Sequence, residues 1–171
     1  MFLSVFEMFK VGIGPSSSHT MGPMVAAARF LDMMRASPFE FSGVKASLHG
    51  SLAFTGVGHA TDRATILGLA GFVPETYDNE HAEAALNAMH STNTLTPEGL
   101  PPLRFDPKTD LIFDYDTQLT GHANGMILMA TDAQGDTILS QVFYSIGGGF
   151  VMTEEELAAG KATDEGDPVP Y

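Results

Sequence analysis

The sequence has no cysteine and no tryptophan among its 171 residues, and it has few basic side chains. Without cysteine the chain can form no disulfide, and it cannot bind zinc or an iron–sulfur cluster through thiolates. Lysine and arginine number 8 against 21 aspartates and glutamates, which gives a formal net charge of −13. This charge disfavours binding to a nucleic-acid backbone or to an anionic membrane surface.

Long apolar runs are also missing. No run reaches about 18 residues, the length that a membrane-spanning helix needs. Glu7 and Lys10 lie where a signal peptide would carry its apolar core. We therefore expect a cytoplasmic protein. The hydrophobic content of 44% is sufficient for one domain with a core of its own.

Apolar residues that recur every three or four positions predict four helices. The first covers residues 4–9, and the second begins at Pro23 and ends before Pro38. The third ends at Gly71, a residue type favoured just past a helix end. The fourth begins after Asp78, whose carboxylate suits the capping position.

Alternation of apolar and polar residues predicts a half-buried strand at residues 44–49, with Lys45, Ser47 and His49 on its polar face. The segment 92–108 contains four prolines and is predicted as a long loop. Further strands are predicted at residues 111–115, 126–131 and 137–145. Turn-forming residues between the last two strands indicate a hairpin, and three consecutive glycines end the last strand.

This order of elements indicates an α+β domain over residues 1–152, with a mixed sheet and helices packed mainly on one face. Residues 153–171 are acidic and contain two glycines and two prolines. We interpret this stretch as a linker that joins the domain to a further part of the protein.

The segment between the first two helices carries the most polar chemistry. Residues 12–20 read Gly-Ile-Gly-Pro-Ser-Ser-Ser-His-Thr, a composition that core packing does not explain. Backbone N–H groups and the hydroxyls of Ser16, Ser17 and Ser18 at a helix start suit a carboxylate or a phosphate. His19 beside them can donate to that anion or move a proton. The alternative is a capped helix, in which one hydroxyl caps the first turn and the others are solvated.

Three other interpretations of this segment lack required residues. A P-loop needs a Gly-Lys-Ser or Gly-Lys-Thr ending, which is absent. A nucleophile elbow needs Gly-x-Ser-x-Gly after a strand, which is also absent. A hydrolase that pairs one of the serines with His19 has no recognisable third, orienting acid.

Two more segments carry candidate site residues. His59 and Asp62 lie three residues apart at a predicted helix start, where both can touch one ligand or where Asp62 can stabilise the helix. Two ligands do not complete a zinc shell, so no metal site is predicted. Gly121, His122 and Asn124 precede a strand and can hold a small amino acid, or they form a turn with left-handed angles at Asn124 and the next glycine. The other histidines are interpreted as structural or solvated: His49, His81 and His90.

Several of these segments together resemble the iron–sulfur L-serine dehydratases. The resemblance begins with Ser-Val-Phe, with the whole 12–20 segment and with Gly-Pro-Met, at residues 4–6, 12–20 and 22–24. It continues in the segments 49–56, 58–63, 121–126 and 144–150, and so covers most of the chain.

The resemblance implies the N-terminal, or beta, domain of an enzyme that converts L-serine to pyruvate and ammonia. In that family a [4Fe-4S] cluster is held by the cysteines of a separate catalytic (alpha) domain or subunit, so this chain would not ligate the cluster. The residues from Ser16 to Thr20 would hold the substrate carboxylate. His19 or His59 would transfer the proton, in an order that the sequence leaves open.

The family's beta domain is similar to the allosteric substrate-binding domain of some D-3-phosphoglycerate dehydrogenases. This likeness implies an L-serine effector site at Gly121, His122 and Asn124. A homodimer is expected, because many such enzymes are symmetric oligomers. The alternative function is a stand-alone binding or regulatory module for small amino acids. The two functions differ in whether the natural reading frame continues past Tyr171 into a cysteine-containing segment.

Overall fold

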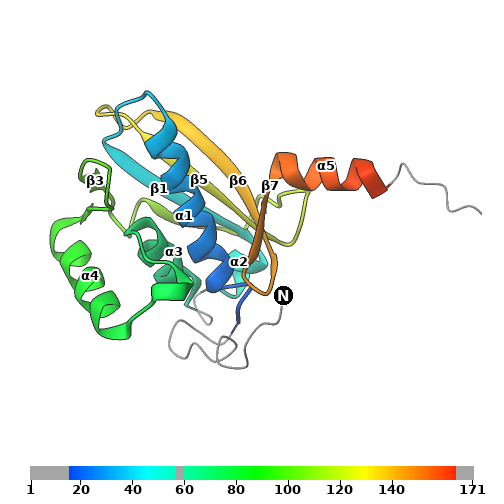
Figure 1. The fold of residues 1–171 in the computed structure, drawn as a ribbon, viewed down its shortest axis with the longest axis horizontal. Helices are drawn as coiled ribbons and strands as arrows, with labels where there is room; N and C mark the ends of the chain where they lie inside the picture. Colours follow the sequence, from blue (N-terminus) through cyan, green and yellow to red (C-terminus); the bar gives the residue numbers. More distant parts are fainter. Residues whose placement is uncertain (1–15, 57–59, 165–171) are drawn as a thin grey trace, which may run out of the picture.

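The computed structural model describes residues 16–56 and 60–164, which form an α+β domain (Figure 1). The helices are α1 (Met21–Ala36), α2 (Ser51–Phe54), α3 (Thr61–Leu69), α4 (Asn79–Thr92) and α5 (Glu154–Asp164), with a 3-10 turn at Pro74–Thr76. The strands are β1 (Gly43–Gly50), β2 (Thr94–Leu95), β3 (Leu103–Arg104), β4 (Leu111–Asp114), β5 (Asn124–Thr131), β6 (Thr137–Gly147) and β7 (Phe150–Thr153). The predicted helix at residues 4–9 lies outside the described residues.

All the strands belong to one mixed sheet, with β1 near its middle. One edge of β1 pairs along its whole length with antiparallel β5, which continues into antiparallel β6 and β7. The other edge pairs with two parallel strands, first with β3 at Gly43 and then with β4. Because β1 is central, the segments that leave its ends are held by neighbours on both sides.

One face of the sheet carries the core. Val44, Ala46 and Leu48 of β1 are buried on this face, where α1 crosses β5, β6 and β7 (Figure 1). Helix α3 packs along α1 and is buried along most of its length. The three helices predicted within the described residues therefore form, and Asp78 caps α4 by accepting the N–H of Glu80.

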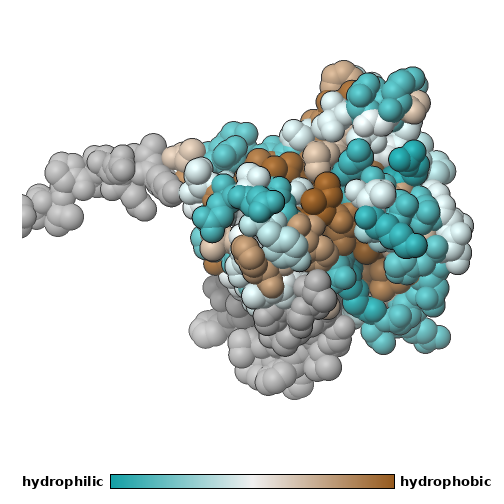
Figure 2. All heavy atoms as spheres, turned by 180° about the vertical axis from the view of Figure 1, so that it is seen from behind, coloured by the Kyte–Doolittle hydropathy of each residue, from teal (hydrophilic) through white to brown (hydrophobic). Residues whose placement is uncertain are grey.

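The opposite face of the sheet shows brown, apolar surface framed by hydrophilic residues (Figure 2). Ser47 and His49 on this face are nevertheless buried, with exposed fractions of 7% and 3%. The prediction of a half-buried strand was wrong for these two side chains. The segment between β4 and β5 folds back over this end of the sheet, and Leu119 there packs against Gly125.

Several further elements were not predicted, among them the short helix α2 and the 3-10 turn at Pro74–Thr76. The two-residue strands β2 and β3 lie within the segment interpreted as a loop. The three glycines after β6 all have positive φ angles, so they form a tight turn into β7 instead of ending the sheet. Helix α5 occupies much of the segment interpreted as a linker. Its start was readable, because Thr153 and Glu156 cap each other's N–H groups, which is the pattern of a capping box.

The close crossing of α1 and α3 depends on Gly68. A Cβ atom there would lie 2.6 Å from Ala27 Cβ and 2.7 Å from the Met24 carbonyl oxygen. We expect Gly68→Ala to lower the free energy of unfolding by about 1–3 kcal/mol, because the helices must separate to admit the methyl group. Thermal or urea unfolding measures the change.

The matched control is Gly160→Ala in α5. This glycine is also helical, but a Cβ atom there meets only the end of a methionine side chain, at 4.0 Å. Alanine favours helix, so the control should leave stability unchanged or raise it slightly. Equal destabilisation by the two substitutions would contradict the packing argument.

Candidate functional site

Four parts of the chain that are distant in the sequence meet at one end of the sheet, which we call the site end. Strand register places Gly50, the last residue of β1, opposite Asn124, the first residue of β5. The next pair along, Gly125 and Tyr144, brings the end of β6 to the same place. Helix α1 begins here, since a Cβ atom on Gly22 would touch the Ser145 side chain. Helix α2 follows β1 directly, and its first residue is Ser51.

His19 lies at the centre of a hydroxyl cluster at the site end. Its Nδ1 is 2.9 Å from Ser18 Oγ and 3.2 Å from Ser16 Oγ. Its Nε2 is 3.0 Å from Ser51 Oγ, on the far side of the ring. The ring is 9% exposed, so it is held in place and has little contact with solvent. Three serine hydroxyls therefore fix the orientation of one histidine.

The partners of His19 allow it to change protonation state. A hydroxyl can both donate and accept a hydrogen bond, whereas a carboxylate only accepts and an ammonium only donates. Whichever ring nitrogen carries the proton, a serine oxygen can adapt by rotating its hydrogen. The arrangement thus suits a histidine that accepts or releases a proton.

The other two hydroxyl residues of the loop have different roles. Thr20 is 1% exposed and its hydroxyl donates to the Ser16 carbonyl oxygen at 2.6 Å, which closes the turn before α1. The Ser17 side chain is exposed, while its carbonyl oxygen accepts the N–H of Gly22. Thr20 is the N-cap of α1 but makes no side-chain capping bond. Simple helix capping therefore does not account for this loop.

The second predicted site, at Gly121, His122 and Asn124, is built around backbone contacts. Asn124 donates its N–H to His122 Nδ1 at 3.0 Å, and its side-chain amide donates to the Ser145 carbonyl oxygen at 3.1 Å. Gly121 donates its N–H to the buried Tyr144 hydroxyl at 3.2 Å. Neither Asn124 nor the following glycine has a positive φ angle, so the left-handed turn weighed as the alternative does not form. His122 is exposed at the tip.

The structure brings the two predicted sites together, which the sequence did not indicate. Ser51 donates its backbone N–H to the Ala123 carbonyl oxygen at 2.8 Å while its hydroxyl contacts His19. Ser51 was missed as a site residue, although it follows a predicted strand directly and lies inside a segment that carried the resemblance. One residue thus touches both the 16–20 loop and the 121–124 segment.

A buried histidine anchors the neighbouring loop. His49 Nε2 lies 2.8 Å from Ser47 Oγ, and its Nδ1 lies 2.8 Å from the Thr117 carbonyl oxygen. Asp114, 3.9 Å from the same ring, accepts the N–H groups of Thr117 and Asp116. These backbone hydrogen bonds hold the pKa of Asp114 below its ordinary value. His49 therefore has a structural role, because it supports the loop that leads to Gly121.

The remaining candidates are peripheral or outside the described residues. His59 lies outside them, so the His59–Asp62 pair is not defined. Asp62 is in the first turn of α3, where a carboxylate stabilises the helix. His81 is exposed and bonded to Asp78, which raises the pKa of His81. Among the described residues, no group of three or more His, Asp or Glu side chains could hold a metal ion. In that same part of the chain, no helix has both the length and the apolar composition to cross a bilayer.

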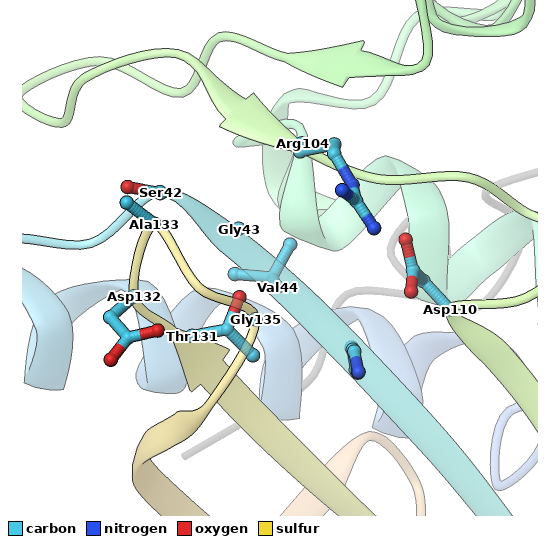
Figure 3. A pocket seen from close by; sticks show the side chains of 10 residues that line it. Ser42, Gly43, Val44, Arg104, Asp110, Thr131, Asp132, Ala133 and Gly135 are labelled. Carbon is cyan, nitrogen blue, oxygen red and sulfur yellow. The ribbon is translucent and has the colours of Figure 1, made fainter.

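A separate small pocket of about 60 Å³ lies at the opposite end of the sheet (Figure 3). Arg104 and Asp110 point toward one another across it, and the hairpin residues Asp132 and Gly135 close its other side (Figure 3). It offers room for a few water molecules or a small ion. The pocket shares no lining residue with the hydroxyl cluster and is not part of the candidate site.

The fold and the site define a class: an α+β domain that presents a histidine among serine hydroxyls at one end of a mixed sheet. The family model "Serine dehydratase beta chain" matches residues 4–156. The chain is 41% identical over 161 residues to an L-serine dehydratase of Streptomyces coelicolor, covering 93% of this chain and 35% of the relative. It is 40% identical over 172 residues to an L-serine dehydratase of Haemophilus influenzae, covering 99% and 38%.

A third relative is L-serine dehydratase TdcG of Escherichia coli, with 39% identity over 172 residues and coverage of 99% and 37%. The chain belongs to the serine dehydratase beta-chain family. It spans a little over a third of the length of the curated relatives that it matches.

The Tyr144 hydroxyl should stabilise the 121–124 segment. Tyr144→Phe removes the acceptor of the Gly121 N–H but keeps the buried ring. We expect a loss of about 1 kcal/mol in the free energy of unfolding and faster hydrogen exchange at the Gly121 amide. Tyr115→Phe is the control, because that side chain is 52% exposed. Indistinguishable effects of the two substitutions would show that the Tyr144 hydroxyl does not hold this segment.

Proposed function

We propose that this chain is the beta part of an L-serine dehydratase and contributes to the conversion of L-serine to pyruvate and ammonia. The family membership and the names of the relatives support the reaction. The observation that carries the assignment to this part of the chain is the clamping of His19 between Ser16, Ser18 and Ser51. The reaction removes a proton and a hydroxyl from serine, so it needs a group that exchanges protons at a fixed position.

Within this proposal the hydroxyls bind and His19 moves the proton. Ser16, Ser17 and Ser18 lie in the turn just before α1, where hydroxyls and N–H groups favour a carboxylate. Ser16 and Ser18 already point to His19, so a carboxylate bound by them would lie beside the imidazole. Thr20 contributes by closing the turn that presents these serines. His59 is proposed as the second proton-transfer residue, on the strength of the family resemblance.

The iron–sulfur cluster belongs to another part of the enzyme in this proposal. The chain has no cysteine, and its described residues offer no set of three metal-binding side chains. They do not fit a [4Fe-4S] cluster, so we assign the cluster to the cysteine-bearing alpha domain or subunit. The relatives are long enough to include such a domain, because this chain covers 35% to 38% of them. A cytoplasmic homodimer is the expected form of the complete enzyme.

We further propose an L-serine effector site at Gly121, His122 and Asn124, in a fold like the allosteric substrate-binding domain of D-3-phosphoglycerate dehydrogenase. His122 Nδ1 accepts a backbone N–H, so its Nε2 is turned away from that bond and can meet a ligand at the exposed tip. The short path through Ser51 to His19 supports communication between this site and the proton-transfer group.

Removing the proposed proton-transfer groups should impair turnover. In the complete enzyme we expect His19→Ala to reduce kcat/KM for L-serine by about 10²- to 10⁴-fold, the usual contribution of general acid–base catalysis. His59→Ala should act similarly. Steady-state pyruvate formation measures both. His90→Ala is the control, since His90 is exposed on α4. Full activity in the His19→Ala, His59→Ala double variant would refute these roles.

The effector site is tested by titration calorimetry of L-serine into the 171-residue chain. We expect stereoselective binding, with no heat from D-serine, and loss of binding in His122→Ala because the ligand loses its exposed imidazole contact. Unchanged binding in His122→Ala would count decisively against the site. Absence of binding to the unaltered chain would mean that this domain meets serine only when joined to its partner.

A further inference from the structure

Large hydrophobic side chains that remain exposed are concentrated at the site end. Six are exposed in the described part of the chain: Phe39, Phe54, Ile112, Tyr115, Ile146 and Phe150. Four of these follow the segments that build the site. Phe54 ends the helix that Ser51 begins, and Tyr115 comes directly after Asp114. Ile146 and Phe150 flank the turn that follows Ser145.

These four side chains, which we call the collar, belong to two groups of segments next to the polar cluster. Phe54 and Tyr115 form an aromatic pair with ring centroids 5.3 Å apart, yet they remain 64% and 52% exposed. In the other group Ile146 and Phe150 are 42% and 68% exposed. The turn that carries them lies against the start of α1, because a Cβ atom on Gly149 would lie 3.4 Å from the Met21 side chain.

Apolar side chains next to a polar site are typical of a protein–protein interface that covers an active site. Scattered exposed hydrophobic residues need no explanation, but a cluster at one place marks an interaction surface. Aromatic residues are enriched in interface cores, where they exclude water from the polar contacts that they enclose. The collar would keep bulk water away from His19 once a second surface covers it.

The curated relatives indicate what that surface is. They align with nearly all of this chain and continue for almost two thirds of their own length outside the match. A second copy of this chain is a poor occupant, because each copy carries a formal charge of −13. Asp114 and Asp116 flank Tyr115, so the covering surface should present basic residues around an apolar centre.

We propose that Phe54, Tyr115, Ile146 and Phe150 form the surface on which the cysteine-bearing catalytic part of the dehydratase docks over the hydroxyl cluster. This inference rests on the proposed function, since it takes its partner from that reaction. It adds the place of contact and the side chains that anchor it.

The experiment is hydroxyl-radical footprinting of the complete enzyme, whether it is one chain or two subunits. Phe39 provides a matched reference inside the same molecule. It is 56% exposed, close to the values for Phe54 and Phe150, but it lies between α1 and β1 at the opposite end of the sheet. We expect Phe54 and Phe150 to be oxidised roughly fivefold or more slowly than Phe39, because an interface core excludes solvent.

Comparable oxidation rates at the three phenylalanines would overturn the proposal. Protection that appears only when two complete enzymes associate would assign the collar to a second copy, and would also overturn it. The proposed function is tested separately by His19→Ala. Protection of the collar together with full turnover in His19→Ala would remove the function and keep the docking surface. Loss of turnover with an unprotected collar would keep the function and remove the docking surface.

Discussion

The site depends on a close approach between Gly50 and the carbonyl group of Ala123. Gly50 has a φ angle of 55°, and a Cβ atom on it would lie 2.3 Å from the Ala123 oxygen. Only glycine fits both the left-handed angle and this spacing. The approach lets the Ser51 N–H bond to the Ala123 oxygen, and so places the Ser51 hydroxyl on His19. The two halves of the site are thus joined by a hydrogen bond between backbone groups, and no charged side chain takes part in it.

The central position of β1 explains why this contact can be maintained. On one side β5 pairs with every residue of β1, and on the other β4 pairs with residues 46–49. His49 then fixes the end of β4 to the following loop through Thr117 and Asp114. Rigid neighbours on both sides allow a glycine at the strand end to hold an unusual angle without loosening the site. The positions of the side chains in the hydroxyl cluster are therefore fixed by the sheet.

Much of the fold could be predicted because each helix and long strand carries its own local signal. The stripe of apolar residues in α1 and the alternation in β1 are visible without any tertiary information. The short strands β2 and β3 have no such pattern, since two residues show no period. Burial of His49 was also hidden, because it comes from a loop that lies 68 residues further along the chain. The three glycines before β7 were predicted to end the strand, but glycine permits a strand to turn as well as to end.

The candidate site was recognisable in parts but not as a whole. His19 and its serines stand out because polar residues crowd a helix start, and Asn124 stands out beside glycines before a strand. Their proximity follows from strand register, which a single sequence does not specify. Ser51 could be found only after that register was known. Ser51 contacts both segments, so a single serine residue separates a ligand bound near Asn124 from a proton on His19.

The same strand register leaves one side of the site end exposed to solvent. The polar cluster lies where the end of β1, helix α2 and the start of α1 meet, and Phe54, Tyr115 and Phe150 are exposed in segments next to it. An isolated domain gains nothing from exposing three aromatic rings beside a buried histidine, since burial of each would be worth about 1.5–3 kcal/mol. That free energy is available to an association that covers the cluster. A surface that lowers the dielectric around His19 would also strengthen its hydroxyl contacts. Assembly and proton transfer would then be coupled through one end of the sheet.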